Sequence, residues 1–151
     1  MSMLFPYRMG RSPKPVITLG GQVQRPKAII DVALLGPTKT ILRQSLLDTG
    51  ADDTVFSLSV ANQAGIDLTG APTMTCAGVG GLPYTVSYVQ VPLRISDGKE
   101  FREWQAWVGF TSASMNRPLM GYAGFLQFFT ATFYGDRKQV ELAINADYPG
   151  T

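Results

Sequence analysis

The residues best suited to chemistry lie together in one short segment, residues 46–53. Asp48 ends a run rich in apolar side chains, and the small residues Thr49, Gly50 and Ala51 come directly after it. A carboxylate placed where an apolar strand stops can be shielded from water and held rigidly, as general acid–base catalysis requires. An aspartate at a strand end is also a common turn residue, because its side chain bonds to the backbone that follows. The triplet alone therefore leaves a catalytic and a structural role open.

The composition excludes several other kinds of site. The chain of 151 residues has the size of one domain, and it contains no histidine and a single cysteine, Cys76. Ser-His-Asp triads, Cys-His dyads, His-ligated zinc sites and an internal disulfide are therefore impossible. Carboxylates remain as the leading candidates for catalysis.

Two features bear on where the protein works. A lone cysteine favours a reducing compartment. The first residues lack the apolar core of a signal peptide, and the longest apolar run, residues 118–134, is interrupted by glycines and too short to span a membrane. We therefore expect a soluble, cytoplasmic protein that has no membrane partner.

The net charge of +2 is distributed unevenly. The first 30 residues hold five of the thirteen basic residues and no acid, so the remaining eight basic and eleven acidic residues leave the body at −3. The basic residues of this first part are Arg8, Arg11, Lys14, Arg25 and Lys27. They are too few and too scattered for a nucleic-acid footprint, so we expect no nucleic-acid partner. The part could instead dock on the body or on a second protein.

Alternating side chains and frequent turn residues predict a mainly β chain. Residues 1–22 predict an extended arm, residues 23–146 the folded domain and residues 147–151 a short tail. The strands are expected at residues 28–35, 40–47, 73–77, 84–95, 101–108, 129–134 and 139–144. A short helix is expected at residues 58–64 and a clearer one at residues 122–128. Strands of this length and spacing suggest a closed or sandwich-like β fold.

The surroundings of Asp48 resemble a known family. Leu46-Leu47-Asp48-Thr49-Gly50-Ala51-Asp52-Asp53-Thr54-Val55 is similar, almost letter for letter, to the active-site strand and loop of retropepsins, the retroviral-type aspartic proteases. Ala77-Gly78-Val79-Gly80-Gly81 resembles the glycine-rich tip of their flap, and Pro118-Leu119-Met120-Gly121 resembles the apolar-apolar-Gly segment that braces their active-site loop. The resemblance covers about residues 28–144, and Phe5-Pro6-Tyr7-Arg8 is similar to small bacterial proteins of this type. It implies a single-domain retropepsin-like acid-protease β-barrel with one or two short helices, active as a two-fold dimer.

The chemistry of this family needs two carboxylates. Two aspartates about 3 Å apart cannot both ionise, so they share one proton. The charged one activates a water molecule, and the neutral one protonates the substrate carbonyl. This chain has one Asp-Thr-Gly, and its other acids, such as Asp31, Asp67, Asp97 and Asp136, lack that setting. The resemblance therefore implies an aspartic endopeptidase for peptides or proteins, in which a homodimer brings Asp48 to its own twin and no metal ion or other cofactor is needed.

The resemblance also assigns roles by position. Asp48, Thr49 and Gly50 would form the catalytic group, in which Thr49 bonds across the dimer axis and Gly50 lets the substrate backbone come close. The residues expected to bind substrate are Ala51, Asp52, Asp53, Val79, Gly80 and Gly81. The two acids would accept hydrogen bonds from the substrate backbone, and the last three residues would cover it. A solvated acidic turn and a plain hairpin turn remain the alternatives for these two groups.

Two features depart from the family pattern. Tyr122 stands where retropepsins usually carry an arginine that pairs with the acid of the active-site loop. Either Tyr122 donates a hydrogen bond to Asp52, or another basic residue serves. The chain beyond Ile144 is short and polar, whereas the amino-terminal arm is long. The arm could be a pro-segment or, through residues 15–19, part of the dimer interface.

Two other functions stay open. A non-catalytic module for binding peptides or proteins would keep the groove without the reaction. A calcium loop that starts at Asp48 is disfavoured, because Ser59 stands where the bidentate glutamate of such a loop is expected.

Overall fold

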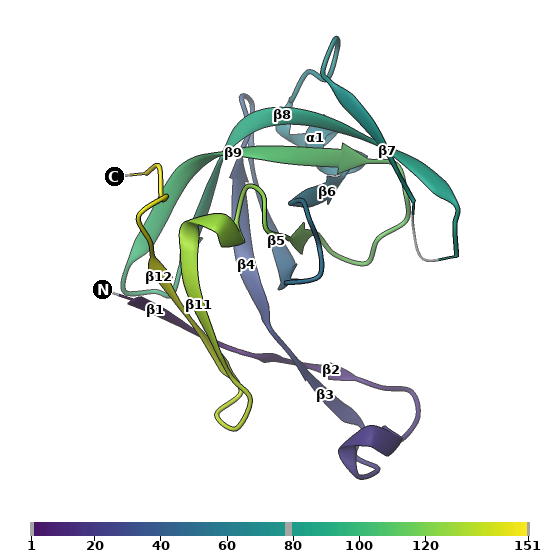
Figure 1. The fold of residues 1–151 in the computed structure, drawn as a ribbon, viewed down its shortest axis with the longest axis vertical. Coiled ribbons are helices and arrows are strands. Elements are labelled where there is room, and N and C mark those ends of the chain that lie inside the picture. The colour runs from purple at the N-terminus through teal and green to yellow at the C-terminus, as the bar shows by residue number, and fades with distance from the viewer. Residues whose placement is uncertain (1, 78–79, 151) are drawn as a thin grey trace.

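The computed structural model describes residues 2–77 and 80–150, and strands dominate it (Figure 1). The strands are β1 (Ser2–Pro6), β2 (Arg8–Arg11), β3 (Gln24–Lys27), β4 (Ile29–Leu35), β5 (Thr40–Leu47), β6 (Val55–Ser57), β7 (Thr73–Ala77), β8 (Pro83–Ser96), β9 (Phe101–Thr111), β10 (Leu119–Met120), β11 (Phe129–Tyr134) and β12 (Gln139–Ile144). The helical elements are α1 (Leu58–Ala64) and two 3-10 turns, η1 (Ile17–Leu19) and η2 (Leu126–Phe128). All the predicted strands are present, with small shifts at their ends, so the mainly β class is confirmed.

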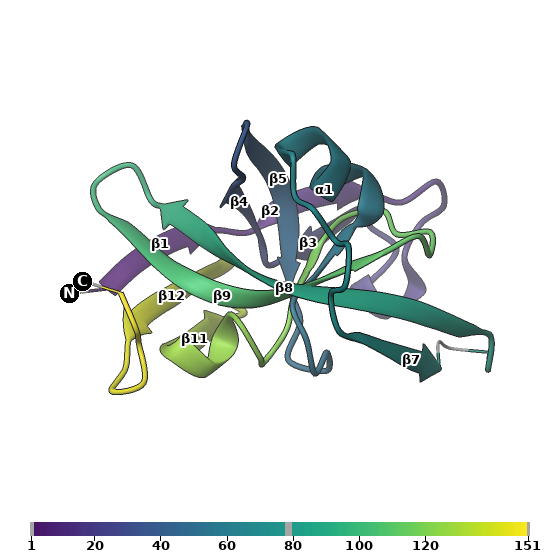
Figure 2. The same cartoon turned by 90° about the horizontal axis from the view of Figure 1, so that it is seen from above.

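The main sheet closes into a barrel. Its strand order is β4-β5-β10-β6-β9-β8-β7, and β4 also pairs with β8. In that second pairing Ala33 lies opposite Arg94 and Leu34 opposite Leu93, so six strands form a closed ring. Among the described residues β7 pairs with β8 alone, along residues 83–87, a part of β8 that β4 does not reach, so β7 stays outside the ring (Figure 2). Closure leaves the barrel with few unpaired strand edges, and it encloses the apolar faces of the strands.

A smaller sheet, in the order β1-β12-β11, packs against the barrel. Met3 and Phe5 alternate with exposed residues along β1, and both are buried. They join Val140 and Leu142 of β12 in the core. The arm expected at residues 1–22 therefore does not stand apart from the domain at its start, because burying these apolar side chains holds β1 in a sheet.

β2 and β3 form a two-stranded hairpin that extends away from the barrel (Figures 1 and 2). Arg8 lies opposite Lys27 in its antiparallel register. At its far end the N–H of Val16 donates to the carbonyl of Gln22 at 2.8 Å. The fold of this end buries Val16 but leaves the side chain of Ile17 92% exposed.

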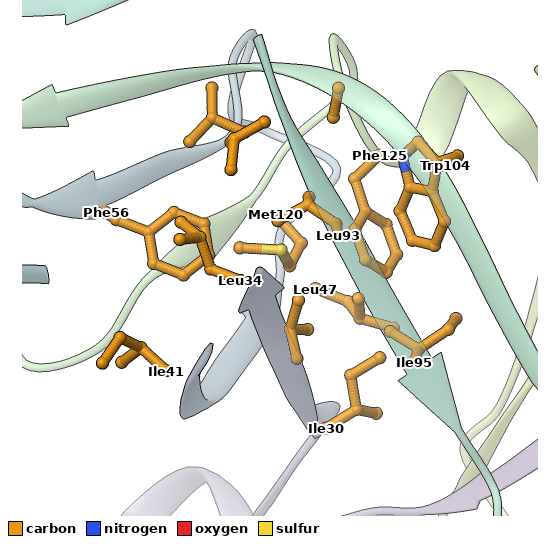
Figure 3. Packing of buried hydrophobic residues seen from close by; sticks show 14 of the residues in the cluster. Ile30, Leu34, Ile41, Leu47, Phe56, Leu93, Ile95, Trp104, Met120 and Phe125 are labelled. Carbon is orange, nitrogen blue, oxygen red and sulfur yellow. The ribbon is translucent and has the colours of Figure 1, made fainter. Parts of the chain in front are cut away.

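One continuous apolar core fills the ring and its junction with the smaller sheet (Figure 3). Its members labelled in the figure are Ile30, Leu34, Ile41, Leu47, Phe56, Leu93, Ile95, Trp104, Met120 and Phe125. The indole N–H of Trp104 donates to the carbonyl of Gly124 at 2.9 Å, and its ring meets the Phe125 ring edge-on at 5.3 Å between centroids. These contacts fix the segment after β10 against β9.

The helix predicted at residues 58–64 is confirmed as α1. Ser57 takes the extended conformation of an N-cap residue, and Gly65 ends the helix with a φ of 76°. That left-handed conformation suits glycine, which has no Cβ, and is a common way for helices to stop.

The helix predicted at residues 122–128 is wrong, because only the 3-10 turn η2 is helical there. Ala123 forms a parallel β-bridge with Asp53, and Gly124 has a φ of 88°. A left-handed residue cannot continue a right-handed helix. The backbone in this segment therefore serves the loop around Asp53 in place of a helix.

Candidate active site

Asp48 stands directly after β5, and hydrogen bonds from three directions fix it. Its N–H donates to the carbonyl of Met120 at 3.1 Å, and its carbonyl accepts the N–H of Ala51 at 3.2 Å. Its Oδ1 accepts the N–H of Gly50 at 2.9 Å, as in an Asx-turn. Within the described chain no donor reaches Oδ2. The side chain thus organises the turn and still presents one oxygen for chemistry.

The short strand β10 holds both ends of the loop that carries Asp48. Leu119 of β10 lies opposite Leu46 of β5 in a parallel pair and opposite Val55 of β6 in an antiparallel pair. β5 leads into the loop and β6 leads out of it. A strand paired with both neighbours therefore fixes the spacing of the loop ends.

The residues after β10 bond to the backbone of the loop itself. The N–H of Tyr122 donates to the backbone carbonyl of Ala51 at 3.0 Å, and the N–H of Ala123 donates to the backbone carbonyl of Asp52 at 2.9 Å. A Cβ at Gly121 would overlap the carbonyl oxygens of Ala51 and Asp53, so only glycine fits there. The apolar-apolar-Gly segment singled out in the sequence thus supports the loop through its backbone.

The side chain of Tyr122 takes no part in this support. It is 62% exposed, and in the described part of the chain its hydroxyl makes no hydrogen bond to Asp52. No lysine or arginine forms an ion pair with Asp52 among the described residues either. The sequence suggested that the side chain of Tyr122, or a basic side chain, supports the loop at Asp52. The support instead comes from backbone hydrogen bonds.

A groove of about 550 Å³ opens beside Asp48. The predicted site residues in its wall are Asp48, Gly50, Ala51, Asp52 and Asp53. Thr49 lies in the same turn but is exposed and outside the wall. The other wall residues come from β6, β7, β8 and β10; they are Val55, Cys76, Ala77, Tyr84, Val86, Tyr88 and Leu119. The structure therefore brings residues 48–54, hereafter the acidic loop, and the β7–β8 hairpin to one groove.

The glycine-rich segment lies between β7 and β8. Gly80 and Gly81 are exposed, with φ of 91° and 78°, values that a side chain would strain. Neither lines the groove in this structure. Val79, also predicted to bind substrate, lies outside the described residues, as does Gly78. On either side of this segment β7 and β8 pair as antiparallel strands, with Ala77 opposite Pro83.

Tyr88 is a groove residue that the site prediction missed. Its hydroxyl donates to Oδ2 of Asp53 at 2.8 Å. Burial, and then the hydrogen bond and negative charge of Asp53, raise the pKa of Tyr88 above its usual value. A signal was available, because Tyr84, Val86 and Tyr88 alternate along β8 and all three line the groove.

Room for the Tyr88 ring depends on its neighbour in the next strand. Tyr88 lies opposite Gly109 of β9, and a Cβ at Gly109 would approach Cε1 of Tyr88 to 3.2 Å. The N–H of Gly109 donates to the carbonyl of Thr54 at 2.8 Å. The hydroxyl of Thr54 in turn donates to the carbonyl of Ala123 at 2.8 Å. β9, the acidic loop and its support thus form one hydrogen-bonded unit.

Two further observations concern ligands and membranes. In residues 2–77 and 80–150, no three Cys, Asp or Glu side chains gather closely enough to hold a metal ion. No helix in the same residues has the length and apolar character to cross a membrane.

Comparisons with known proteins agree with this geometry. A family model described as "Aspartyl protease" matches residues 30–123, which include the acidic loop, the β7–β8 hairpin and β10. A retropepsin-like aspartic protease from Rickettsia conorii has a similar structure, with a TM-score of 0.56 and 19% identity; the match covers 94% of this chain and 98% of that one. The retroviral protease-like domain of Ddi1 from Leishmania major gives a TM-score of 0.51 and 11% identity, over 83% of this chain and 94% of that one. No curated protein matches in sequence. At these identities the two structures show the fold alone.

Proposed function

Because the chain belongs to the aspartyl protease family and has the retropepsin-like fold, we propose that it is an aspartic endopeptidase that works as a homodimer. The observation that carries the proposal is the place of Asp48. It directly follows a strand of the barrel, a hydrogen-bonded turn holds it, and it lines a groove of about 550 Å³ together with residues of the β7–β8 hairpin.

The proposed reaction uses the Asp48 carboxylates of two chains. One proton shared between them leaves one carboxylate charged, and that carboxylate takes a proton from a bound water molecule. The water attacks the peptide carbonyl while the neutral carboxyl donates its proton to the carbonyl oxygen. As the amide bond breaks, the carboxyl that took the water proton gives it to the leaving nitrogen, and the other carboxylate takes a hydroxyl proton from the intermediate, so the pair again shares one proton. The turn bond from Gly50 to Oδ1 of Asp48 supports this role, because it fixes the carboxylate before substrate arrives.

The roles of the neighbouring residues follow from the same proposal. Thr49 is exposed beside Asp48, where it would bond across the two-fold axis. Gly50 and Ala51 would lie along the substrate backbone, and Asp52 and Asp53 would accept its N–H groups. The segment with Gly80 and Gly81 would close over the bound peptide and exclude water.

The β2–β3 hairpin supports the proposed dimer. Figures 1 and 2 both show it projecting on the same side of the molecule as the free end of the β7–β8 hairpin. An isolated two-stranded hairpin is marginally stable in water, yet this one exposes Ile17, Leu19 and Met9. Its surplus of basic residues complements a body of net charge −3. We therefore place the second copy of the chain against this hairpin.

A non-catalytic binding module is the alternative. The Asx-turn gives Asp48 a purely structural task, and the groove could hold a peptide without cutting it. Such a module would dimerise and bind peptides but release them intact.

The deciding experiment is cleavage of a diverse peptide library at acidic to near-neutral pH, with wild-type protein and the Asp48→Asn variant. The proposal requires cleavage by the wild type, its loss in Asp48→Asn and its inhibition by a statine-type compound. Dimeric wild-type protein that binds such a compound but cuts no peptide in the library would favour the binding module.

A further inference from the structure

The wall of the groove contains a tyrosine–carboxylate pair that the proposed reaction does not use. The Tyr88 hydroxyl donates to Oδ2 of Asp53 at 2.8 Å, and both residues line the groove. Asp53 belongs to the acidic loop, whereas Tyr88 belongs to β8, 35 residues later in the chain. The pair therefore joins the acidic loop to β8 within the lining of the groove.

Both ends of this hydrogen bond are held by the backbone. Asp53 forms a β-bridge with Ala123. The N–H of Tyr88 donates to the carbonyl of Pro72 at 2.9 Å, and its ring lies against the backbone at Gly109, where a Cβ would crowd it. The Asp53 carboxylate is thus fixed before any ligand binds, which lowers the entropy lost on binding.

The hydrogen bond from Tyr88 occupies one oxygen of the Asp53 carboxylate and leaves the other able to accept a hydrogen bond from a ligand. The phenol is a neutral donor, so the pairing brings no positive charge to the Asp53 carboxylate. In the described part of the chain, no donor reaches its other oxygen, Oδ1. The wall contains two more carboxylates, Asp48 and Asp52, and among the described wall residues there is no lysine or arginine. A ligand group that carries positive charge would therefore meet no cation in the groove.

We propose that Asp53, held by Tyr88, selects a lysine or arginine side chain at one position of the substrate that flanks the cleaved bond. Tyr88 is the positioning residue and Asp53 makes the contact. A charged N–H donor is favoured over a neutral one because a charge-assisted hydrogen bond to a carboxylate is about twice as strong as a neutral one. The proposal deepens the proposed function and rests on the groove being the peptide site.

The test measures binding, so that it does not depend on turnover. The probes are statine-centred peptides made in pairs, in which one residue within three positions of the statine is either lysine or its uncharged isostere norleucine. Dissociation constants are measured by calorimetry for the wild type, Tyr88→Phe and Asp53→Asn. We expect at least one lysine peptide to bind the wild type about tenfold more tightly than its norleucine twin. The preference, which is the ratio of the two dissociation constants measured on the same protein, should fall below about twofold in both variants.

The matched control is Tyr134→Phe, which removes another tyrosine–carboxylate hydrogen bond, to Glu141 at 3.2 Å, from the smaller sheet. It should keep the full lysine preference, and thermal unfolding of every variant shows whether the fold is intact. Asp53→Asn keeps the Tyr88 ring, so it tests the contact even if Tyr88→Phe is destabilised. A preference that survives in both variants, or its absence at every position in the wild type, overturns the proposal. Binding with the expected preference but no cleavage would sink the protease function and leave this inference standing, whereas no binding by any peptide would overturn both.

Discussion

Gly121 lies so close to the carbonyl oxygen of Asp53 that no Cβ could fit between them. This contact brings the segment after β10 against the acidic loop, and the hydrogen bonds from Tyr122 and Ala123 then complete the support. The position of the loop, and so of Asp48, depends on the absence of a Cβ at Gly121, which lies 73 residues after Asp48 in the sequence.

Gly121→Ala should therefore unfold more easily than the wild type, by about 3 kcal/mol, because the new methyl group forces backbone carbonyls apart. Urea denaturation followed by tryptophan fluorescence measures this free energy. Gly135→Ala is the matched control, since a Cβ there meets no atom within 4 Å, and it should change stability by less than about 0.5 kcal/mol. Equal stability of the two variants would contradict the close contact.

Mixing wild-type protein with Asp48→Asn should reveal the shared dyad. If each site needs both carboxylates, mixed dimers are inactive; an equal amount of the variant then leaves about half of the activity per wild-type chain, and a fourfold excess leaves about one fifth. Initial cleavage rates are measured after the chains have exchanged. The control adds the same amounts of serum albumin. Rates that stay constant at every ratio would mean that each chain works alone.

Ile17→Asp should weaken the dimer without harming the fold. The side chain is 92% exposed in the single chain, so its replacement should change the free energy of unfolding by less than about 0.5 kcal/mol. Buried in the proposed interface, the new charge should raise the dimer dissociation constant about tenfold or more. Sedimentation equilibrium gives this constant. Leu42→Asp, which alters an exposed leucine on the barrel, is the control. An unchanged dissociation constant for Ile17→Asp would remove the hairpin from the interface.

The pH dependence of stability should carry a signature of Tyr88. Its pKa is raised in the folded state, so the neutral phenol contributes stability that is fully present below the unfolded pKa of about 10. That contribution is lost as the pH rises from there through the higher folded pKa. Ultraviolet titration of tyrosinate should show Tyr88 ionising after the exposed tyrosines. Asp53→Asn removes a nearby negative charge and should bring the Tyr88 transition down. Identical titration curves for the two proteins would contradict the pairing.

Much of the site could be predicted from local sequence. Asp48 was singled out by its place after an apolar strand, and the loop to Asp53 by its resemblance to the retropepsin active-site segment, whereas the strand at residues 40–47 was predicted because alternation is a local pattern. The helix at residues 122–128 was predicted from apolar spacing and was wrong. There, the bridge from Ala123 to Asp53 and the left-handed Gly124 override the pattern.

The sequence by itself determined the mainly β class, the single Asp-Thr-Gly and the exclusion of histidine chemistry, because these depend only on residue type and near neighbours. The tertiary structure decided the rest of the site. It paired Asp53 with Tyr88, placed Gly121 under the acidic loop and drew β1 into the core. Each of these contacts joins residues far apart in the chain, and closing such loops is repaid only by burial and hydrogen bonding in the complete fold, which no local pattern records.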